Sequence, residues 1–284
     1  MHTSAACRLL LALTLALWAG SAAGQSPQPL VIRAEIDNRI ISPVTARFIE
    51  QAISKAESAD AEALILVLDT PGGLVESTRQ ITKRILSSEV PVVVYVGPSG
   101  ARAASAGLFV TTAAHIAAMS PGTNIGAAHP VGVGGVPMPG GSAPDESKKA
   151  KDEESQKEAP GSPMEQKAVN DTVAWVRSMA ELRGRNADWV ERAVRESVSA
   201  SASDALELRV VDLLVDDFAD LLRKLDGRTV TLGRDRTVTL KTAGAKVETV
   251  SLWWGEKVLS AVAHPNVAFL LMMFGFYGVL LELY

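Results

Sequence analysis

Two glycine-rich turns carry the residue types that acyl-transfer chemistry requires. Each follows an apolar run: the first turn is DTPGG at 69–73, and the second contains AASAG at 103–107. Glycines between a strand and a helix leave backbone N–H groups free to hold an anion, so Gly72 and Gly73 are candidates for an oxyanion hole. Ser105 lies at the start of the next helix, where its hydroxyl can act as a nucleophile. Together the two turns predict a site for acyl transfer.

A serine hydroxyl needs a proton acceptor within about 3 Å before it can attack a carbonyl carbon. Two residues of the sequence could supply one. Lys167 could do so if burial lowers its pKa from about 10.4 towards 7–8. His129 already has a suitable pKa and would need only a carboxylate to orient its ring. Spacing and periodicity leave both bases open.

The residues around these turns predict a parallel sheet. The runs at 63–68 and 90–96 are apolar and rich in β-branched residues, a pattern typical of strands that are buried on both faces. Residues 30–36 alternate as a strand, and helices are expected at 43–56 and 74–86. Because strands and helices alternate, we expect right-handed crossovers onto one sheet, and therefore an α/β fold.

This pattern is interrupted at 126–163, where glycine, proline, serine and mixed charges dominate. Such a composition buries too little apolar surface to order itself, so we expect a flexible loop inside the domain. Loops of this length are often lids or binding loops, and a simple insertion is the alternative. The elements expected after the loop are a helix from 164 to 182 with Lys167 near its start, helices at 186–194 and 217–225, and a hairpin at 229–240.

The two ends of the chain predict export and a membrane anchor. Residues 1–24 combine Arg8, an apolar stretch and small residues, which indicates a secretory signal peptide. Its removal takes away Cys7, the one cysteine of the chain, and with it disulfides and thiolate–metal sites. Residues 263–284 are predicted to form an incomplete transmembrane segment, since their apolar run is slightly short of about 20 residues. The domain between the ends would then lie outside the cytoplasm, anchored in the lipid bilayer.

Composition argues against several other functions. The formal net charge is −4 and no basic stripe is interleaved with aromatic residues, so nucleic acid is not an expected partner. The sequence has no G-x-x-x-x-G-K-[ST] loop, so we expect no ATP hydrolysis. Neither a cofactor nor a metal is expected.

The chain between the two ends is long enough for one large domain at 25–226, followed by a small β-rich linker region at 227–262.

Several motifs taken together resemble the NfeD family of membrane-bound serine proteases, which belongs to the Clp protease/crotonase superfamily. They are DTPGG at 69–73, AASAG at 103–107, PGTNIGA at 121–127, the helix at 167–186 and the closing run HPNVAFLLMMFGFYG. The resemblance covers nearly the whole mature chain, and the combination is specific although each motif alone is weak. It implies a Clp/crotonase-like serine protease domain at 25–226.

By this resemblance the catalytic pair is a Ser–Lys dyad, Ser105 and Lys167, and the oxyanion hole uses the N–H groups of Gly72 or Gly73 and of Ala106. It implies a membrane-anchored endopeptidase that works without ATP and cleaves hydrophobic segments of membrane proteins, notably of stomatin-like partners. A homodimer or larger assembly is also implied. His129 falls where the soluble Clp peptidase carries its histidine, which keeps it as the alternative base.

Three alternatives remain open. An acyl-CoA hydratase or isomerase shares the fold but uses carboxylates in the cytoplasm, which the signal peptide argues against. A signal-peptide peptidase-like enzyme also pairs a serine with a lysine at the membrane. A non-catalytic scaffold would bind a stomatin-like partner through the 126–163 loop and the membrane segment.

The sequence also departs from the family pattern in two ways. The loop before Lys167 is longer and more charged, and the later spans and β-barrel domain of the long form are lacking.

Overall fold

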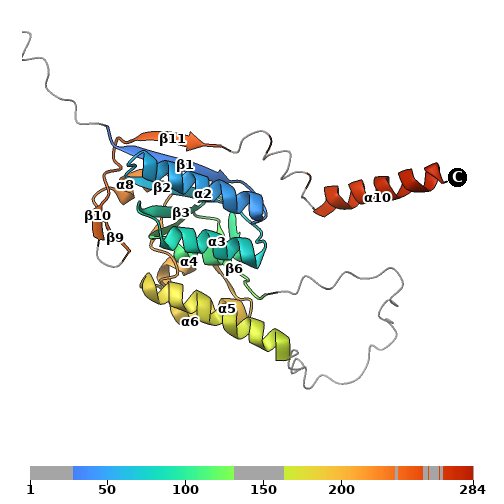
Figure 1. Ribbon diagram of the computed structural model, residues 1–284. Coiled ribbons are helices and arrows are strands. Elements are labelled where there is room, and N and C mark those ends of the chain that lie inside the picture. The colour runs from blue at the N-terminus through green and yellow to red at the C-terminus, as the bar shows by residue number, and fades with distance from the viewer. Residues whose placement is uncertain are drawn as a thin grey trace, which may run out of the picture.

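The computed structural model describes residues 28–130, 163–233, 236–251, 255, 262 and 265–283. The predicted signal peptide at 1–24 lies outside the described residues, and so does most of the predicted loop at 126–163. The described chain contains one large sheet with helices on both faces (Figure 1).

The large sheet has six strands, and all of its pairings are parallel. In spatial order they are β11 (Lys246–Val250), β1 (Leu30–Ile36), β2 (Ala63–Leu68), β3 (Val92–Val96), β5 (Ile116–Met119) and β8 (Leu213–Leu214). The α/β fold with a parallel sheet and helical crossovers is therefore confirmed. The predicted β-rich region at 227–262 contributes β11, which extends this sheet by pairing with β1.

The helices follow the strands in the expected alternation. They are α2 (Pro43–Ser58), α3 (Val75–Leu86), α4 (Ala106–Ala113), α5 (Pro163–Leu182), α6 (Ala187–Arg195), α7 (Ala202–Glu207), α8 (Phe218–Leu225) and α10 (Pro265–Glu282). The start of α2 shows why the boundaries were predictable: Ser42 Oγ accepts a hydrogen bond from the Thr45 N–H at 3.3 Å, and Pro43 occupies the first turn.

Both faces of the sheet are buried, as the β-branched runs predicted. In β2, Leu64, Leu66 and Leu68 join the apolar cluster under α2, α3 and α4. Their alternate neighbours Ala63 and Ile65 join a second cluster with α8 on the opposite face. This double burial fixes the carboxyl ends of β2 and β3, from which the two glycine-rich turns emerge.

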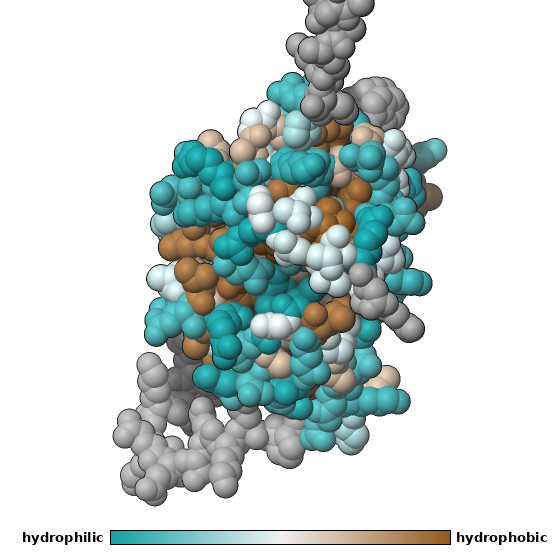
Figure 2. Space-filling model, turned by 90° about the vertical axis from the view of Figure 1, so that its left-hand side faces the viewer, coloured by the Kyte–Doolittle hydropathy of each residue, from teal (hydrophilic) through white to brown (hydrophobic). Residues whose placement is uncertain are grey.

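Two smaller sheets complete the domain. β4 (Arg102–Ala104), β6 (Asn124–Gly126) and β7 (Ser199–Ser201) form a three-stranded sheet beside the two glycine-rich turns. β9 (Thr229–Leu232) and β10 (Arg236–Thr239) form an antiparallel hairpin, as predicted. The hairpin lies at the left of Figure 1, and Figure 2 shows that side of the molecule, where hydrophilic residues cross the middle of the surface.

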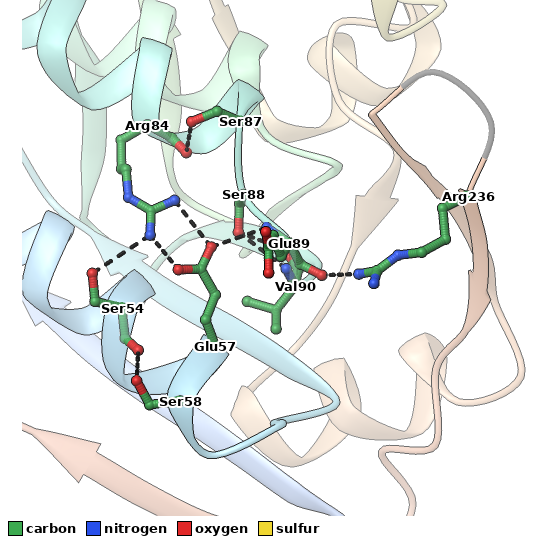
Figure 3. Close-up of polar contacts among 9 residues, drawn as sticks. All are labelled: Ser54, Glu57, Ser58, Arg84, Ser87, Ser88, Glu89, Val90 and Arg236. Carbon is green, nitrogen blue, oxygen red and sulfur yellow. Dashed lines mark hydrogen bonds and ion pairs between the residues drawn. The ribbon is translucent and has the colours of Figure 1, made fainter.

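A polar cluster joins α2, α3 and the hairpin near the start of β3 (Figure 3). Arg84 of α3 forms an ion pair with Glu57 of α2, and the Glu89 N–H donates to the same carboxylate at 3.0 Å. Arg236 of β10 donates to the Glu89 carbonyl. Burial by itself would raise the pKa of Glu57, but the bonds from Arg84 and Glu89 outweigh it and lower that pKa below its ordinary value.

The predicted transmembrane segment at 263–284 is not supported. Among the described residues, no helix is both long and apolar enough to cross a membrane. Helix α10 has 18 residues, from Pro265 to Glu282. Its apolar side chains are exposed along the helix.

Candidate active site

The turn after β2 is held by a buried threonine. Thr70 Oγ1 donates to the Arg39 carbonyl at 2.6 Å and accepts from the Gly72 N–H at 3.1 Å. The Gly72 carbonyl in turn accepts from the Ile41 N–H at 2.8 Å. A Cβ on Gly73 would lie only 2.1 Å from the Ile41 carbonyl oxygen, so this close backbone approach requires glycine. The DTPGG motif therefore builds a fixed turn.

Ser105 caps α4 in a strained conformation. Its φ is +50° and its ψ is −111°, a region that non-glycine residues rarely occupy. The surrounding backbone holds it there, since the Ser105 N–H donates to the Gly126 carbonyl at 2.9 Å and the Ala104 N–H donates to the Thr70 carbonyl at 3.2 Å. The Ser105 hydroxyl makes no capping bond to α4. The side chain is partly buried and its oxygen is available for chemistry.

The two glycine-rich turns meet. A Cβ on Gly72 would lie 2.7 Å from the Ser105 Cβ and 3.2 Å from its Oγ. Gly72 also has a φ of +126°, where a side chain would be strained. Only glycine can therefore occupy the position that faces the nucleophile.

The three predicted oxyanion donors are not equivalent. The Gly72 N–H is already bound to Thr70 Oγ1. By contrast, neither the Gly73 N–H nor the Ala106 N–H donates to any residue that the structure describes. Ala106 is the first residue of α4, where the N–H has no partner inside the helix and the helix dipole favours negative charge. Gly73 and Ala106 are therefore the available pair.

A small cavity of about 30 Å³ opens beside Ser105. Its walls are mostly apolar and come from the first turn, α3, α4, α5 and the end of the segment after β6: Gly73, Val75, Thr78, Ser105, Ala106, Phe109, Ala128, Pro130, Thr172 and Trp175. This volume holds only a couple of water molecules, so a larger apolar side chain requires a wall to move.

The α5 wall is held by an aromatic contact that the sequence reasoning missed. The rings of Phe109 and Trp175 stack with centroids 4.6 Å apart. The Arg79 guanidinium lies 4.3 Å from the centroid of the Trp175 ring and also pairs with Asp171. The helical spacing of Thr172 and Trp175 was the available signal, because it places both side chains on one face of α5.

Lys167 is not joined to Ser105. It lies on α5 as predicted, but its side chain is exposed, so the burial that a neutral lysine requires is lacking. Ala168 shares the cavity-facing side of α5 with Thr172, and Lys167 is offset from it by about 100° around the helix. Five residues also place Lys167 about 7.5 Å along the axis from Thr172. No hydrogen bond between described residues links the two predicted dyad members.

His129 is positioned by a different contact. Its Nδ1 lies 3.0 Å from the Val194 carbonyl oxygen. Because a carbonyl can only accept, Nδ1 carries the proton and Nε2 is left as an acceptor. No bond between His129 and Ser105 is found among the described residues. The neighbouring Ala128 and Pro130 line the cavity, whereas His129 does not.

Comparison with known proteins identifies the family of this chain. The sequence profile of the NfeD1b N-terminal domain family matches residues 31–233. The chain is 33% identical to the membrane-bound protease PH1510 of Pyrococcus horikoshii over 253 residues, which is 89% of this chain and 52% of that protein. The chain therefore spans about half the length of this relative.

Two solved structures share the fold. One is the 1510-N membrane-bound stomatin-specific protease as a lysine-to-alanine mutant in complex with a substrate peptide, with a TM-score of 0.69 and 31% identity over 84% of this chain and 99% of that one. The other is a serine-to-alanine mutant of the same protease, with a TM-score of 0.67 and 31% identity over 80% of this chain and all of that one. The chain belongs to the NfeD1b family, and it carries the N-terminal domain of that family at residues 31–233.

Proposed function

We propose that this chain is a membrane-associated serine endopeptidase that cleaves hydrophobic segments of membrane proteins, including stomatin-like partners. The observation that carries the proposal is the meeting of the two turns. A strained Ser105 with an uncapped hydroxyl faces Gly72, and the Gly73 and Ala106 N–H groups are available at the same place. A nucleophile beside two free donors is the arrangement that peptide-bond attack requires.

In the proposed mechanism, neutral Lys167 takes the Ser105 hydroxyl proton while Oγ bonds to the peptide carbonyl carbon. The Gly73 and Ala106 N–H groups hold the resulting oxyanion, at about 3 kcal/mol for each donor. The C–N bond then breaks, and the lysine ammonium gives its proton to the leaving amine. Water attacks the acyl-enzyme, transfers a proton through Lys167 and releases the carboxylic acid with Ser105 restored.

This mechanism requires the first turns of α5 to move. Lys167 must bring its Nζ within about 3 Å of Ser105 Oγ, and the cavity beside Ser105 must enlarge to admit an apolar side chain. Both changes involve α5, which forms one wall of the cavity through Thr172 and Trp175. We propose that a bound peptide or a second copy of the chain shifts α5 and covers Lys167. The existence of a peptide complex of a lysine-to-alanine relative supports the choice of a lysine.

Membrane association and location are part of the proposal. The matched relative is named a membrane-bound protease. Helix α10 exposes a continuous apolar surface, which can lie against lipid. The signal-like residues 1–24 favour a domain outside the cytoplasm.

The second candidate mechanism uses His129 as the base. Its Nδ1–H is anchored on the Val194 carbonyl, which leaves Nε2 as the acceptor that a general base needs. A non-catalytic scaffold is the third possibility and predicts no cleavage at all.

These candidates are separated by cleavage assays on the full chain in detergent, with an apolar peptide from the C-terminal part of a stomatin-like protein. Ser105→Ala and Lys167→Ala should each lower kcat by at least about 10³-fold, whereas His129→Ala should retain activity. The exposed substitutions Ser58→Ala and Lys241→Ala are matched controls. Loss of activity in His129→Ala with retention in Lys167→Ala would replace the lysine mechanism. An inactive wild type would favour the scaffold.

A further inference from the structure

A second cavity, of about 370 Å³, lies at the opposite end of the sheet from Ser105. His115 and Ile116 at the start of β5 form its floor, Leu182 and Arg183 at the end of α5 form one wall, and Asp212 and the strand β9 form the rest. Because the strands are parallel, their starts lie at the edge away from the turns that follow β2 and β3. The proposed protease chemistry does not use this cavity.

His115 lines this cavity and carries a buried proton donor. The Val92 N–H donates to His115 Nδ1 at 3.1 Å, so Nδ1 is the acceptor and Nε2 carries the hydrogen. The residue is only 9% exposed, and Nε2 has no hydrogen-bond partner among the described residues. A buried donor without an acceptor costs free energy, so an acceptor at this position would be stabilising.

The adjacent arginines add further donors and a surplus of positive charge. Arg183 Nε donates to the Ala113 carbonyl at 2.9 Å, but its Nη2 is buried and finds no acceptor among the described residues. Arg185 Nη1 donates to the Thr112 and Ala114 carbonyls, and its Nη2 donates to the Asp212 carboxylate. Asp212 therefore pairs with Arg185, whereas Arg183 forms no ion pair among the described residues.

The electrostatics agree with that surplus. Burial, followed by repulsion from Arg183 and Arg185, lowers the pKa of His115 to about 3. Burial and the charge of Arg185 lower the pKa of Arg183 to about 10. Each shift shows that additional positive charge is disfavoured here. A bound anion would offset the repulsion between these positive charges.

We propose that this cavity binds a small oxyanion, the phosphate or carboxylate group of a ligand, between Arg183 and Arg228 and above His115. The two buried donors, Arg183 Nη2 and His115 Nε2–H, match a group that can only accept hydrogen bonds. Both residues line the cavity, and because Arg183 is partly exposed its side chain can turn to bring the guanidinium to a ligand. Arg228 and the hydroxyls of Thr229 and Thr231 line the outer part of the same cavity.

Such a ligand would connect three parts of the fold: the start of β5, the end of α5 and the hairpin strand β9. Hydrophilic residues cross the middle of the molecular face on the hairpin side (Figure 2), as a site for a charged ligand requires. The hairpin should therefore become more ordered when the anion binds. The cavity is larger than one phosphate ion, so the anionic group can belong to a larger molecule.

The test is a titration of the full chain with inorganic phosphate and, separately, with acetate, each at constant ionic strength maintained with chloride. We expect the midpoint of thermal unfolding to rise by several degrees and to saturate in the millimolar range for at least one anion. Line broadening of the phosphate ³¹P NMR signal gives a direct second readout. The response to phosphate against that to acetate identifies which group the site prefers.

Arg183→Gln should weaken binding at least about tenfold, since charged donors carry most of the attraction for an oxyanion. Because Arg183 also holds the Ala113 carbonyl, Arg228→Gln is a second variant, at an exposed side chain on the outer part of the cavity whose Nε donates to the Lys224 carbonyl. Arg47→Gln, an exposed change of the same charge on α2, is the control. The proposal fails if neither anion gives a saturable response, or if Arg183→Gln and Arg228→Gln respond as the control does.

Discussion

Gly72 and Ser105 are in direct contact, although 33 positions separate them: a Cβ on Gly72 would lie 2.7 Å from the Ser105 Cβ. The contact links the turn after β2 to the first residue before α4. It brings the strained serine and the free Gly73 and Ala106 N–H groups into one small volume. The first prediction tests this contact by filling the space at Gly72.

Gly72→Ala should destabilise the fold by about 1–3 kcal/mol and abolish most peptidase activity, because the new methyl group displaces Ser105 and strains the backbone. Gly100→Ala is a matched control. Gly100 also has a positive φ, of +93°, but a Cβ there meets nothing within 4 Å. Thermal unfolding and cleavage should be measured for both. Equal loss of activity in the two variants would contradict a role for the Gly72 contact.

Trp175→Ala should lower stability by about 2–3 kcal/mol, since it removes the stack on Phe109 and the Arg79 cation–π contact along with buried apolar area. The same change removes a wall of the cavity beside Ser105, so we expect KM to change more than the intrinsic acylation rate. Trp175→Phe should recover most of the stability. Denaturant unfolding and steady-state kinetics measure the two effects, and an unchanged KM in Trp175→Ala would remove this side chain from the substrate site.

Acid should weaken the cluster of Glu57 and Arg84. The folded-state pKa of Glu57 is below its ordinary value, so the unfolded chain binds a proton first as the pH falls. The stabilisation is complete above the unfolded pKa of about 4.3 and is lost as the pH falls through the folded value. Unfolding curves of wild type and Glu57→Gln between pH 7 and pH 3 should converge with acid. Parallel curves would show that this carboxylate carries no pH-dependent stability.

His115 should add a second acid-sensitive component at higher pH. Its folded-state pKa is about 3, whereas an unfolded histidine has a pKa of about 6.5. Between these pH values His115 is protonated in the unfolded chain but not in the folded chain. The free energy of unfolding therefore falls steadily as the pH drops from about 6.5 towards 3. NMR titration of the imidazole signals checks the value directly. A His115 resonance that titrates near pH 6.5 in the folded protein would contradict it.

Much of the fold could be predicted because its signals are local. A few neighbouring residues suffice to predict the strand β2, from its apolar run, and the start of α2, from Ser42 and Pro43. Such patterns need no knowledge of distant contacts.

The parts that sequence reasoning missed depend on tertiary contacts. Gly72 differs from Gly73 as a donor only because Thr70 Oγ1 captures the Gly72 N–H. The pairing of β11 with β1 joins residues more than 200 positions apart, which no local pattern encodes. The transmembrane prediction rested on apolar composition, but among the described residues no helix is both long and apolar enough to cross a membrane. The direction in which Lys167 points depends on how α5 is rotated against the rest of the domain, and spacing alone does not give that rotation.

The central claim is that Ser105 is the nucleophile of a peptidase, and trapping the acyl-enzyme tests it most directly. The full chain should be mixed with an apolar peptide thioester, quenched in acid within milliseconds to seconds, digested and mapped by mass spectrometry. We expect the acyl group on the peptide that contains Ser105, a much slower appearance in Lys167→Ala, and none in Ser105→Ala. An acyl group on another residue, or Ser105→Ala that turns over substrate like the wild type, would contradict the account.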